Sequence, residues 1–548
     1  MLVDSSLLLA EVASVPLQAI DFVLLVGTVL GVTAFGMWIG RREKGTADYF
    51  LAGKSVAWWV VAGSIFGTNV SSHHMVGMMG AGLKEGFAQA NFEFGAIFGL
   101  LMLCYFFLPF YRRMGVYTLS EYLGRRFDDR SRLLYSITNM AFLLIQMVGT
   151  LILGALTVET LTKNSDFAIS YQWSVYLLAG VAALYTIFGG LKAVIYTDFI
   201  QSVLLLAGGG TLAVLAIWHP DVGGISGLLE KQPDKFHVFF EASHDELPWS
   251  GVLSGLMVLH LYYWGTNQFI VQRTLGAKSG WDARMGVITA GFFKLLIPFL
   301  CIVPGMAAAY ILNIDPETES DTAFAGLART LLPAGYGLVG LVMAGLIGGI
   351  LSTIDSMMNS TSTLFTFDVY KKYLDPEASE MRLIWVGRVA MMAMICLAIG
   401  LSIMFGQTQG GIFNTMADYN AYLVPGVIVA YVAGILQPLV TRTASFVCIL
   451  AGPLLSVAFE VTSASMFDHK LQAFHRAGLA TLACYAVLLA VSYATTRERD
   501  PQREHYTWGQ YKEERHSEQA RGPAWYRNDR LWAAILVAAT LWMCWFFA

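Results

Sequence analysis

Long apolar segments constrain the fold of this chain more than any other feature of its sequence. Fourteen such segments can be counted, and most reach the roughly 20 residues that a helix needs to cross a bilayer. They lie approximately at 20–40, 55–81, 90–112, 131–161, 170–189, 192–218, 249–271, 282–312, 335–370, 385–407, 411–436, 442–461, 476–496 and 530–548. Because backbone groups in lipid must be hydrogen-bonded internally, we expect an all-α integral membrane protein with about 14 transmembrane helices.

The composition excludes other classes of protein. Only 14% of the 548 residues are charged and 56% are hydrophobic, whereas soluble domains average about 25% and 45–50%. A soluble enzyme, a nucleic-acid binder or a disordered scaffold is therefore disfavoured. The net charge of −4 gives no reason to expect nucleic acid as a partner.

Lysine and arginine concentrate in alternate loops. The strongly basic loops follow odd-numbered segments; one of them, the polar stretch 497–530, holds seven Arg and one Lys. Loops after even-numbered segments, such as 82–89, hold about one Lys each. Since positive charge is retained in the cytoplasm, we expect cytoplasmic basic loops and both termini outside. Residues 1–19 lack Lys and Arg, so the first segment is expected to be retained rather than cleaved.

Two segments are interrupted by polar residues at the depth of the membrane centre. Residues 64–75 read SIFGTNVSSHHM, and residues 260–268 read HLYYWGTNQ. Paired broken helices of this kind form substrate and ion sites in transporters built from inverted repeats. The alternative is that these small and hydroxylated residues only pack helices together.

A third polar signal lies in segment 335–370. Ser352, Ser356, Asn359 and Thr363 share one helical face, and Thr353 adds a hydroxyl beside Ser352. Sodium, like other hard cations, prefers oxygen ligands. These hydroxyls, facing carbonyls that a broken helix leaves free, predict a sodium site; the alternative is again helix packing.

Three motifs carry a family resemblance: GGLKAVIYTDFIQ at 189–201, YYWGTNQFIVQRT at 262–274 and NSTSTLFTFDVY at 359–370. The chain resembles the sodium/solute symporters, and among them the bacterial sodium/sugar symporters of the galactose or glucose type. The resemblance implies one membrane domain over 1–548, located in the plasma membrane of a bacterium. It also implies two inverted five-helix repeats of the amino-acid-transporter type at 55–218 and 249–436. A leading helix at 20–40 and trailing helices at 442–548 would complete it.

The resemblance also implies a sodium site. Its ligands would be backbone carbonyls and two hydroxyls, at Gly67, Val70, Gly349, Ser352 and Thr353. Asp198 matches an aspartate of the family that handles sodium, although on sequence alone it could equally be a solvated cap. Na+ is the expected coupling ion, and no transition metal is expected.

For the substrate, the resemblance implies a site at Asn69, His74, Glu93, His260, Tyr263, Trp264 and Lys294. Glu93 and Lys294 would bind hydroxyl groups, and the alternative is a purely structural ion pair between them. The gates would be Met78, Phe92, Phe413 and Tyr263. This chain departs from its relatives at His260 and at Ala417, where a sugar-binding glutamine is expected.

The function that follows is sodium-coupled import of a sugar or sugar-like solute by alternating access, without enzymatic chemistry. The expected partners are the lipid bilayer and a monosaccharide, a polyol or a sugar acid. Two alternatives stay open: a sodium- or proton-coupled symporter of an organic anion such as a uronate or carboxylate, and a non-transporting membrane sensor. The sequence gives no indication of the oligomeric state.

Overall fold

The computed structural model of the chain is built almost entirely from helices, as the apolar segments predict. It describes residues 18–41, 45–163, 165–312, 314, 320–333, 335–406, 412–467, 471–495, 505–509 and 525–548, with backbone alone at 321, 412–417, 466 and 467. Within these ranges there is no β-strand, and only two isolated bridges pair extended residues, Val56 with Ala277 and Phe240 with Pro248.

The helices of the first half of the chain are α2 (Ala19–Gly40), α3 (Thr46–Leu51), α4 (Trp58–Asn69), α5 (Met79–Glu85), α6 (Asn91–Met102), α7 (Leu108–Met114), α8 (Ser120–Arg126), α9 (Asp129–Thr162), α10 (Tyr171–Ile217) and α11 (Gly224–Lys231). Those of the second half are α12 (Trp249–Gly251), α13 (Met257–His260), α14 (Gln268–Leu275), α15 (Gly280–Lys294), α16 (Val303–Ile311), α17 (Ala323–Leu331), α18 (Leu338–Leu364), α19 (Glu380–Phe405), α20 (Ile412–Leu436), α21 (Arg442–Phe467), α22 (Ala473–Ala494) and α25 (Asp529–Phe546). Several are extended by π-helical turns, such as His73–Met78 and Leu261–Thr266.

Within the described residues, 11 continuous helical stretches are long and apolar enough to cross a membrane. This number is three lower than the fourteen segments of the sequence, because three of those segments do not form separate continuous helical stretches. Segments 170–189 and 192–218 form the single stretch Tyr171–Ile217, and 55–81 contributes only its second half, continuous with 90–112. Segment 249–271 is divided among short helices.

Helix α10 shows why a merged stretch still contains two segments. Its 47 residues would extend roughly 70 Å as one straight helix, over twice the hydrocarbon thickness. At Gly190 the backbone adopts φ 56° and ψ −164°, a conformation that glycine permits without a steric penalty. Tyr185 and Asp198, on either side of this break, both bond to α18, at Asp355 and Ser352.

Both predicted helix interruptions are confirmed. Helix α4 ends at Asn69, and Val70 is extended with φ −86° and ψ 100° before the chain resumes helical structure. Asn267 is likewise extended, with φ −95° and ψ 128°, between the π-helical turn Leu261–Thr266 and α14. The helical backbone is therefore interrupted at Val70 and at Asn267.

The basic loops meet on one face of the helix bundle. Arg132 bonds to Asp368 at 2.6 Å, and Lys372 bonds to Asp129 at 3.0 Å. Arg113 reaches His505 of the stretch 497–530 at 2.5 Å. The C-terminal end lies with a different loop, since Val238 donates to the Phe547 carbonyl at 2.8 Å. Contacts therefore bring together loops that the charge pattern assigns to the same side.

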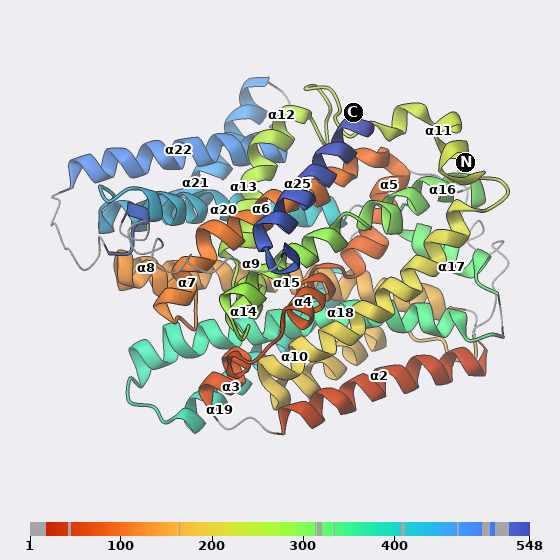
Figure 1. Cartoon of the computed structure of the whole chain (residues 1–548), viewed down its shortest axis with the longest axis horizontal. Coiled ribbons are helices and arrows are strands. Elements are labelled where there is room, and N and C mark those ends of the chain that lie inside the picture. The colour runs from red at the N-terminus through yellow and green to blue at the C-terminus, as the bar shows by residue number, and fades with distance from the viewer. Residues whose placement is uncertain are drawn as a thin grey trace.

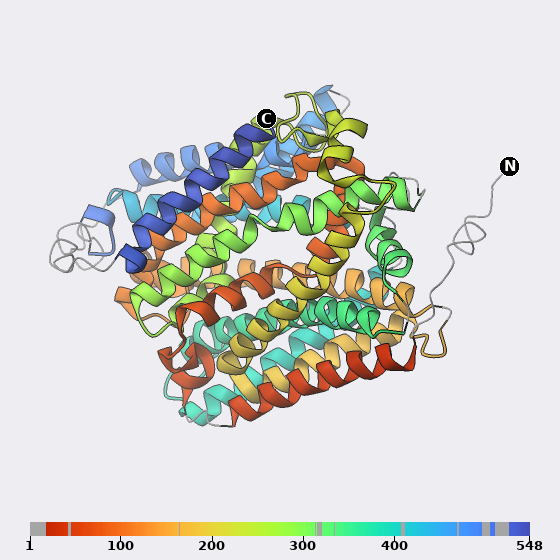
Figure 2. The same cartoon turned by 45° about the vertical axis from the view of Figure 1, so that its right-hand side comes forward.

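Figure 1 shows α2 on one flank and α21 with α22 on the other, with α9, α10 and α18 between them. In the turned view of Figure 2 the long helices run roughly side by side across the molecule. Helix α18 and its π-helical continuation (Leu338–Leu374) are the most enclosed of these helices. In their most apolar membrane-length stretch, 83% of the residues are buried. This places the polar stripe of α18 inside the bundle, next to the break in α4.

Candidate functional site

A cavity of about 140 Å³ lies beside the two helix breaks. All seven side chains predicted to bind the substrate line it: Asn69, His74, Glu93, His260, Tyr263, Trp264 and Lys294. They come from α4, α6, α13, α15 and the two π-helical turns. Segments up to 225 residues apart in sequence thus converge on one cavity.

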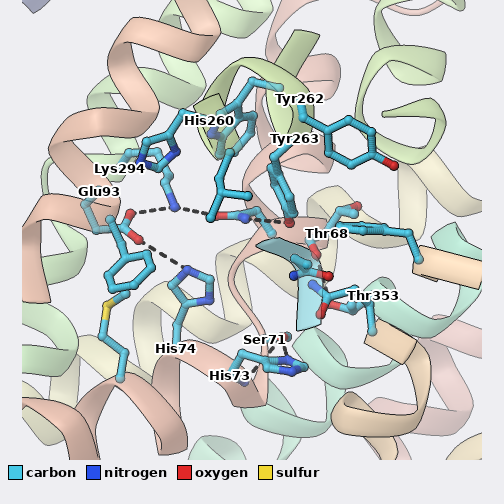
Figure 3. Close-up of a pocket in the computed structure, with 18 of the residues that line it drawn as sticks. Thr68, Ser71, His73, His74, Glu93, His260, Tyr262, Tyr263, Lys294 and Thr353 are labelled. Carbon is cyan, nitrogen blue, oxygen red and sulfur yellow. Dashed lines mark hydrogen bonds and ion pairs between the residues drawn. The ribbon is translucent and has the colours of Figure 1, made fainter. Parts of the chain in front are cut away.

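A buried charged cluster forms one wall of this cavity. Lys294 Nζ lies 2.5 Å from Glu93 Oε2, and His74 Nε2 lies 3.2 Å from Glu93 Oε1. The Lys294 and Glu93 side chains are only 3% and 1% exposed. Figure 3 shows the three side chains turned toward one another, with His260 close to Lys294. Charges this deep in a membrane protein are costly unless paired, and they mark functional sites.

Asn69 connects this cluster to the aromatic wall. Its side-chain oxygen accepts a hydrogen bond from Lys294 Nζ, and its nitrogen donates to the Tyr263 hydroxyl at 2.9 Å. Lys294 Nζ also lies 5.4 Å from the centre of the Trp264 ring, within the range of a cation–π contact. A residue at the end of broken helix α4 therefore reaches both the cation and the aromatic side chain.

His260 keeps hydrogen-bonding capacity in the cavity. Its Nε2 is buried without a hydrogen-bond partner among the described residues. The ring lies directly over Gly95, where an added Cβ would be 2.5 Å from Nε2. Buried polar atoms normally have partners, so His260 is an exception in the wall of the cavity.

Of the predicted gate residues, Met78, Phe92 and Tyr263 line the cavity. Phe92 also packs edge-on against Phe474 of α22, with ring centres 5.9 Å apart. Phe413 is in α20, but its side chain lies outside the described residues, as does that of Ala417.

Oxygen atoms gather next to the cavity where α18 passes the break in α4. The Thr353 hydroxyl lies 2.9 Å from the Thr68 carbonyl and 3.0 Å from the Gly349 carbonyl, and its one proton can be donated to either. The Val70 carbonyl faces Gly349, at 2.9 Å from where a Cβ would stand. A hydroxyl and carbonyls from two helices form a donor set suited to a small hard cation, so Val70, Gly349 and Thr353 fit a sodium ion.

Ser352 and Gly67 face α10 instead. The Ser352 hydroxyl donates to Asp198 Oδ1 at 2.6 Å. A Cβ at Gly67 would be 2.3 Å from Ser202 Oγ, so its α-carbon packs closely against α10. The predicted cage residues thus separate into two neighbouring groups, one at the helix break and one around Asp198.

Asp198 is fully buried, which contradicts the alternative that it is a solvated cap. Arg273 Nη2 lies 3.1 Å from its Oδ2, and Ser64 and Thr68 donate to the same oxygen at 2.6 and 3.1 Å. Asp355, close by, accepts from Tyr185 at 2.5 Å and from Ser356 at 2.9 Å. The acidic groups near α18 are therefore enclosed in a network of hydroxyls and one guanidinium.

Three of the side chains that bond to Asp198 are not in the predicted site: Ser64, Thr68 and Arg273. Ser64 and Thr68 are four residues apart on α4, so they share a helical face. Arg273 is a charged residue inside the motif 262–274. These two signals are present in the sequence, but neither indicates Asp198 as the common partner.

Among the described residues, no group of three His, Cys, Asp or Glu side chains is placed to hold a metal ion. His73 instead lies 3.3 Å from Thr150 Oγ1 through its Nδ1.

Comparison with known proteins shows the family. The model of the "Sodium:solute symporter family" matches residues 49–452. The sodium/glucose cotransporter of Vibrio parahaemolyticus is 33% identical over 462 residues, which cover 78% of this chain and 82% of that protein. Sodium/myo-inositol cotransporter 2 of Sus scrofa is 34% identical over 477 residues, which cover 80% of this chain and 70% of that protein.

The fold also has a solved counterpart. The substrate-bound, outward-open structure of a Na+-coupled sialic acid symporter aligns with a TM-score of 0.77 at 21% identity. The alignment covers 88% of this chain and 99% of that one. At this identity the likeness concerns the fold.

The buried polar cavity between interrupted helices defines a multi-pass membrane transporter. The chain belongs to the sodium:solute symporter family. It is accordingly a transporter and not an enzyme, and Na+ is its coupling ion.

Proposed function

We propose that this protein imports a neutral sugar or polyol together with sodium by alternating access. The observation that carries the proposal is the Glu93–Lys294 pair in the wall of the cavity, with 2.5 Å between Nζ and Oε2. A carboxylate and an ammonium side by side can accept from and donate to neighbouring hydroxyl groups of one solute. His74, Asn69 and the free Nε2 of His260 extend this pattern of donors and acceptors.

The same pair argues against an organic anion as the substrate. The positive charge of Lys294 is already compensated by Glu93, so a carboxylate would enter a pocket with no net charge to attract it. Relatives named for glucose and myo-inositol support a neutral polyhydroxylated solute. A uronate or carboxylate is therefore the second choice.

Sodium would bind where the Thr353 hydroxyl meets the carbonyls of Val70 and Gly349, with Ser352 and Asp198 as neighbours. Such an ion would join broken helix α4 to α18 and so favour one conformation of the pair. Because linkage is reciprocal, a solute that binds more tightly in that conformation raises sodium affinity by the same factor.

The proposed topology keeps fourteen spans, with inverted repeats at 55–218 and 249–436 and both termini outside the inner membrane of a bacterium. The break at Gly190 and the division of 249–271 support separate spans there. The contacts between basic loops on one face support a cytoplasmic location of that face.

Uptake in proteoliposomes tests the proposal. With an inward tenfold Na+ gradient, we expect glucose or myo-inositol to accumulate up to about tenfold at one-to-one coupling. A matching K+ gradient is the control and should give no accumulation. Accumulation of glucuronate, with no response to the hexose or inositol, would replace the neutral solute by an anion.

A thermal-shift screen identifies the solute more closely. Monosaccharides, polyols and uronates are added to the purified protein with Na+ or with K+. A ligand that binds the folded state raises the unfolding temperature by mass action, and we expect the true solute to do so more strongly in Na+.

A further inference from the structure

A second cavity lies outside the transport site, between the N-terminal ends of α4, α15 and α25. Its volume is about 920 Å³, and its lining includes Trp58, Lys278, Trp281, Arg527 and Trp532. Figures 1 and 2 show the start of α25 beside α15, on the part of the bundle where α4 also begins. The cavity therefore opens where three helices reach the same edge of the bundle.

One end of this cavity is cationic. Lys278 and Arg527 are both exposed, and Arg527 has no carboxylate within ion-pairing distance among the described residues. Asp282 is the acidic group in the lining, and it already accepts from the Trp58 backbone at 3.1 Å, from Ser279 at 2.5 Å, and pairs with Lys278 at 3.6 Å. The positive charge at this end thus exceeds the negative charge.

The other end is apolar and follows one face of α15. Met285, Ile288 and Phe292 succeed Trp281 at spacings of three and four residues, so they form a continuous stripe along the helix. Trp532 of α25 faces this stripe, with its ring centre 6.3 Å from that of Phe292. The chemistry changes from cationic to apolar over about three helical turns.

Aromatic residues lie between the cationic end and the apolar end of the cavity. Trp281 Nε1 donates to the Arg527 carbonyl at 2.6 Å, and Trp532 Nε1 donates to the Tyr526 carbonyl at 3.1 Å. Trp58 packs edge-on against Trp281 at 6.5 Å. Tryptophan and tyrosine collect at the level of lipid headgroups, so the cationic end lies at the membrane surface and the stripe lies in the hydrocarbon.

We propose that this cavity is a binding site for an anionic phospholipid. The phosphate would lie between Lys278 and Arg527, and one acyl chain would follow Met285, Ile288 and Phe292. Basic pockets between transmembrane helices are suited to acidic headgroups, and the apolar stripe supplies the complement for the chain. The site is independent of the transported solute, and only the choice of leaflet depends on the proposed topology.

The test uses the full-length protein in detergent micelles with phosphatidylglycerol or phosphatidylcholine added. We expect phosphatidylglycerol to raise the unfolding temperature by about 2 °C or more over phosphatidylcholine, and native mass spectrometry to detect the retained lipid. Lys278→Gln with Arg527→Gln should abolish the difference, with affinity falling roughly fivefold for each cation removed.

Two further variants separate the parts of the site. Lys371→Gln with Arg382→Gln removes the same charge from the π-helical segment Phe365–Leu374, which continues α18, and from α19. Both positions lie outside the cavity, so the lipid effect should stay intact. Thr289→Trp should fill the apolar end and weaken lipid binding while both cations remain.

Several results would overturn the proposal. They are an equal response to phosphatidylcholine, an equal response to soluble glycerol phosphate, and a loss of lipid binding in the Lys371 and Arg382 control. A dimer that occupies the cavity and excludes lipid in native mass spectrometry would also reject it.

Discussion

Two buried ion pairs lie close together in this protein and are built differently. Glu93 pairs with Lys294, and Asp198 pairs with Arg273; in both pairs the side chains are no more than 3% exposed. The first pair lines the cavity, whereas neither Asp198 nor Arg273 is part of its lining. The two pairs are therefore equally buried, but only the Glu93–Lys294 pair borders the cavity.

The partners of the two pairs explain the difference. Asp198 accepts from Ser64, Thr68 and Ser352 in addition to Arg273. Arg273 in turn donates to Ser64 at 2.7 Å and to Ser356. Within the described residues, by contrast, Lys294 pairs with Glu93 and donates to Asn69, and Glu93 has His74 as its second partner.

A buried charge is tolerated when the remaining hydrogen-bonding positions are filled. Around Asp198, side chains of the protein occupy these hydrogen-bonding positions. The Asp198–Arg273 pair therefore connects α4, α10, α14 and α18. Around Glu93 and Lys294, positions remain for a solute. We therefore expect the Asp198 network to support the fold and the Glu93–Lys294 pair to recognise the substrate.

The largest expected effect is a loss of stability in Arg273→Met. This change leaves Asp198 buried without a cation, which costs about 3–5 kcal/mol in the free energy of unfolding. Thermal unfolding of the purified protein measures it. Arg273→Lys keeps the charge and should lose less. An Arg273→Met protein as stable as the parent would show that Asp198 does not need its partner.

A smaller effect, on binding rather than stability, is expected for Glu93→Gln. Losing hydrogen bonds to a charged group costs about 1.5–3 kcal/mol, which corresponds to roughly 10- to 150-fold weaker solute binding. Glu85→Gln, on α5 and outside the cavity, is the matched control. Binding measured by solute-dependent thermal shift should change only in the first variant. Normal uptake kinetics in Glu93→Gln would show that the Glu93–Lys294 pair has a structural role and does not bind the solute.

The smallest effect is expected for Thr353→Val, which keeps the shape of the side chain but removes the hydroxyl. Loss of one oxygen ligand should raise the half-saturating sodium concentration about tenfold, equivalent to about 1.4 kcal/mol. Thr353→Ser retains the oxygen and should behave like the parent. Sodium dependence of uptake, measured at saturating solute, decides between them, and an unchanged value in Thr353→Val would exclude this hydroxyl as a ligand.

Much of the site is visible in the sequence because polar residues are conspicuous in apolar segments. The breaks at Val70 and Asn267 follow from short polar runs, and the charges of Glu93 and Lys294 stand out in their helices. The Asp198 network is less predictable. Nothing in the sequence indicates that Ser64, Thr68 and Arg273 share Asp198 as a partner. That contact arises only when α4 and α14 pack against α10.

By itself, the sequence determined the class of protein, the alternation of basic loops and the positions where helices are interrupted. These properties follow from hydropathy, charge and local polarity, which act over a few turns of chain. Only the tertiary structure decided which charges are paired, since Asp198 and Arg273 are separated by 75 residues and Glu93 and Lys294 by about 200. Pairing depends on which helices pack together, and that is a property of the whole bundle.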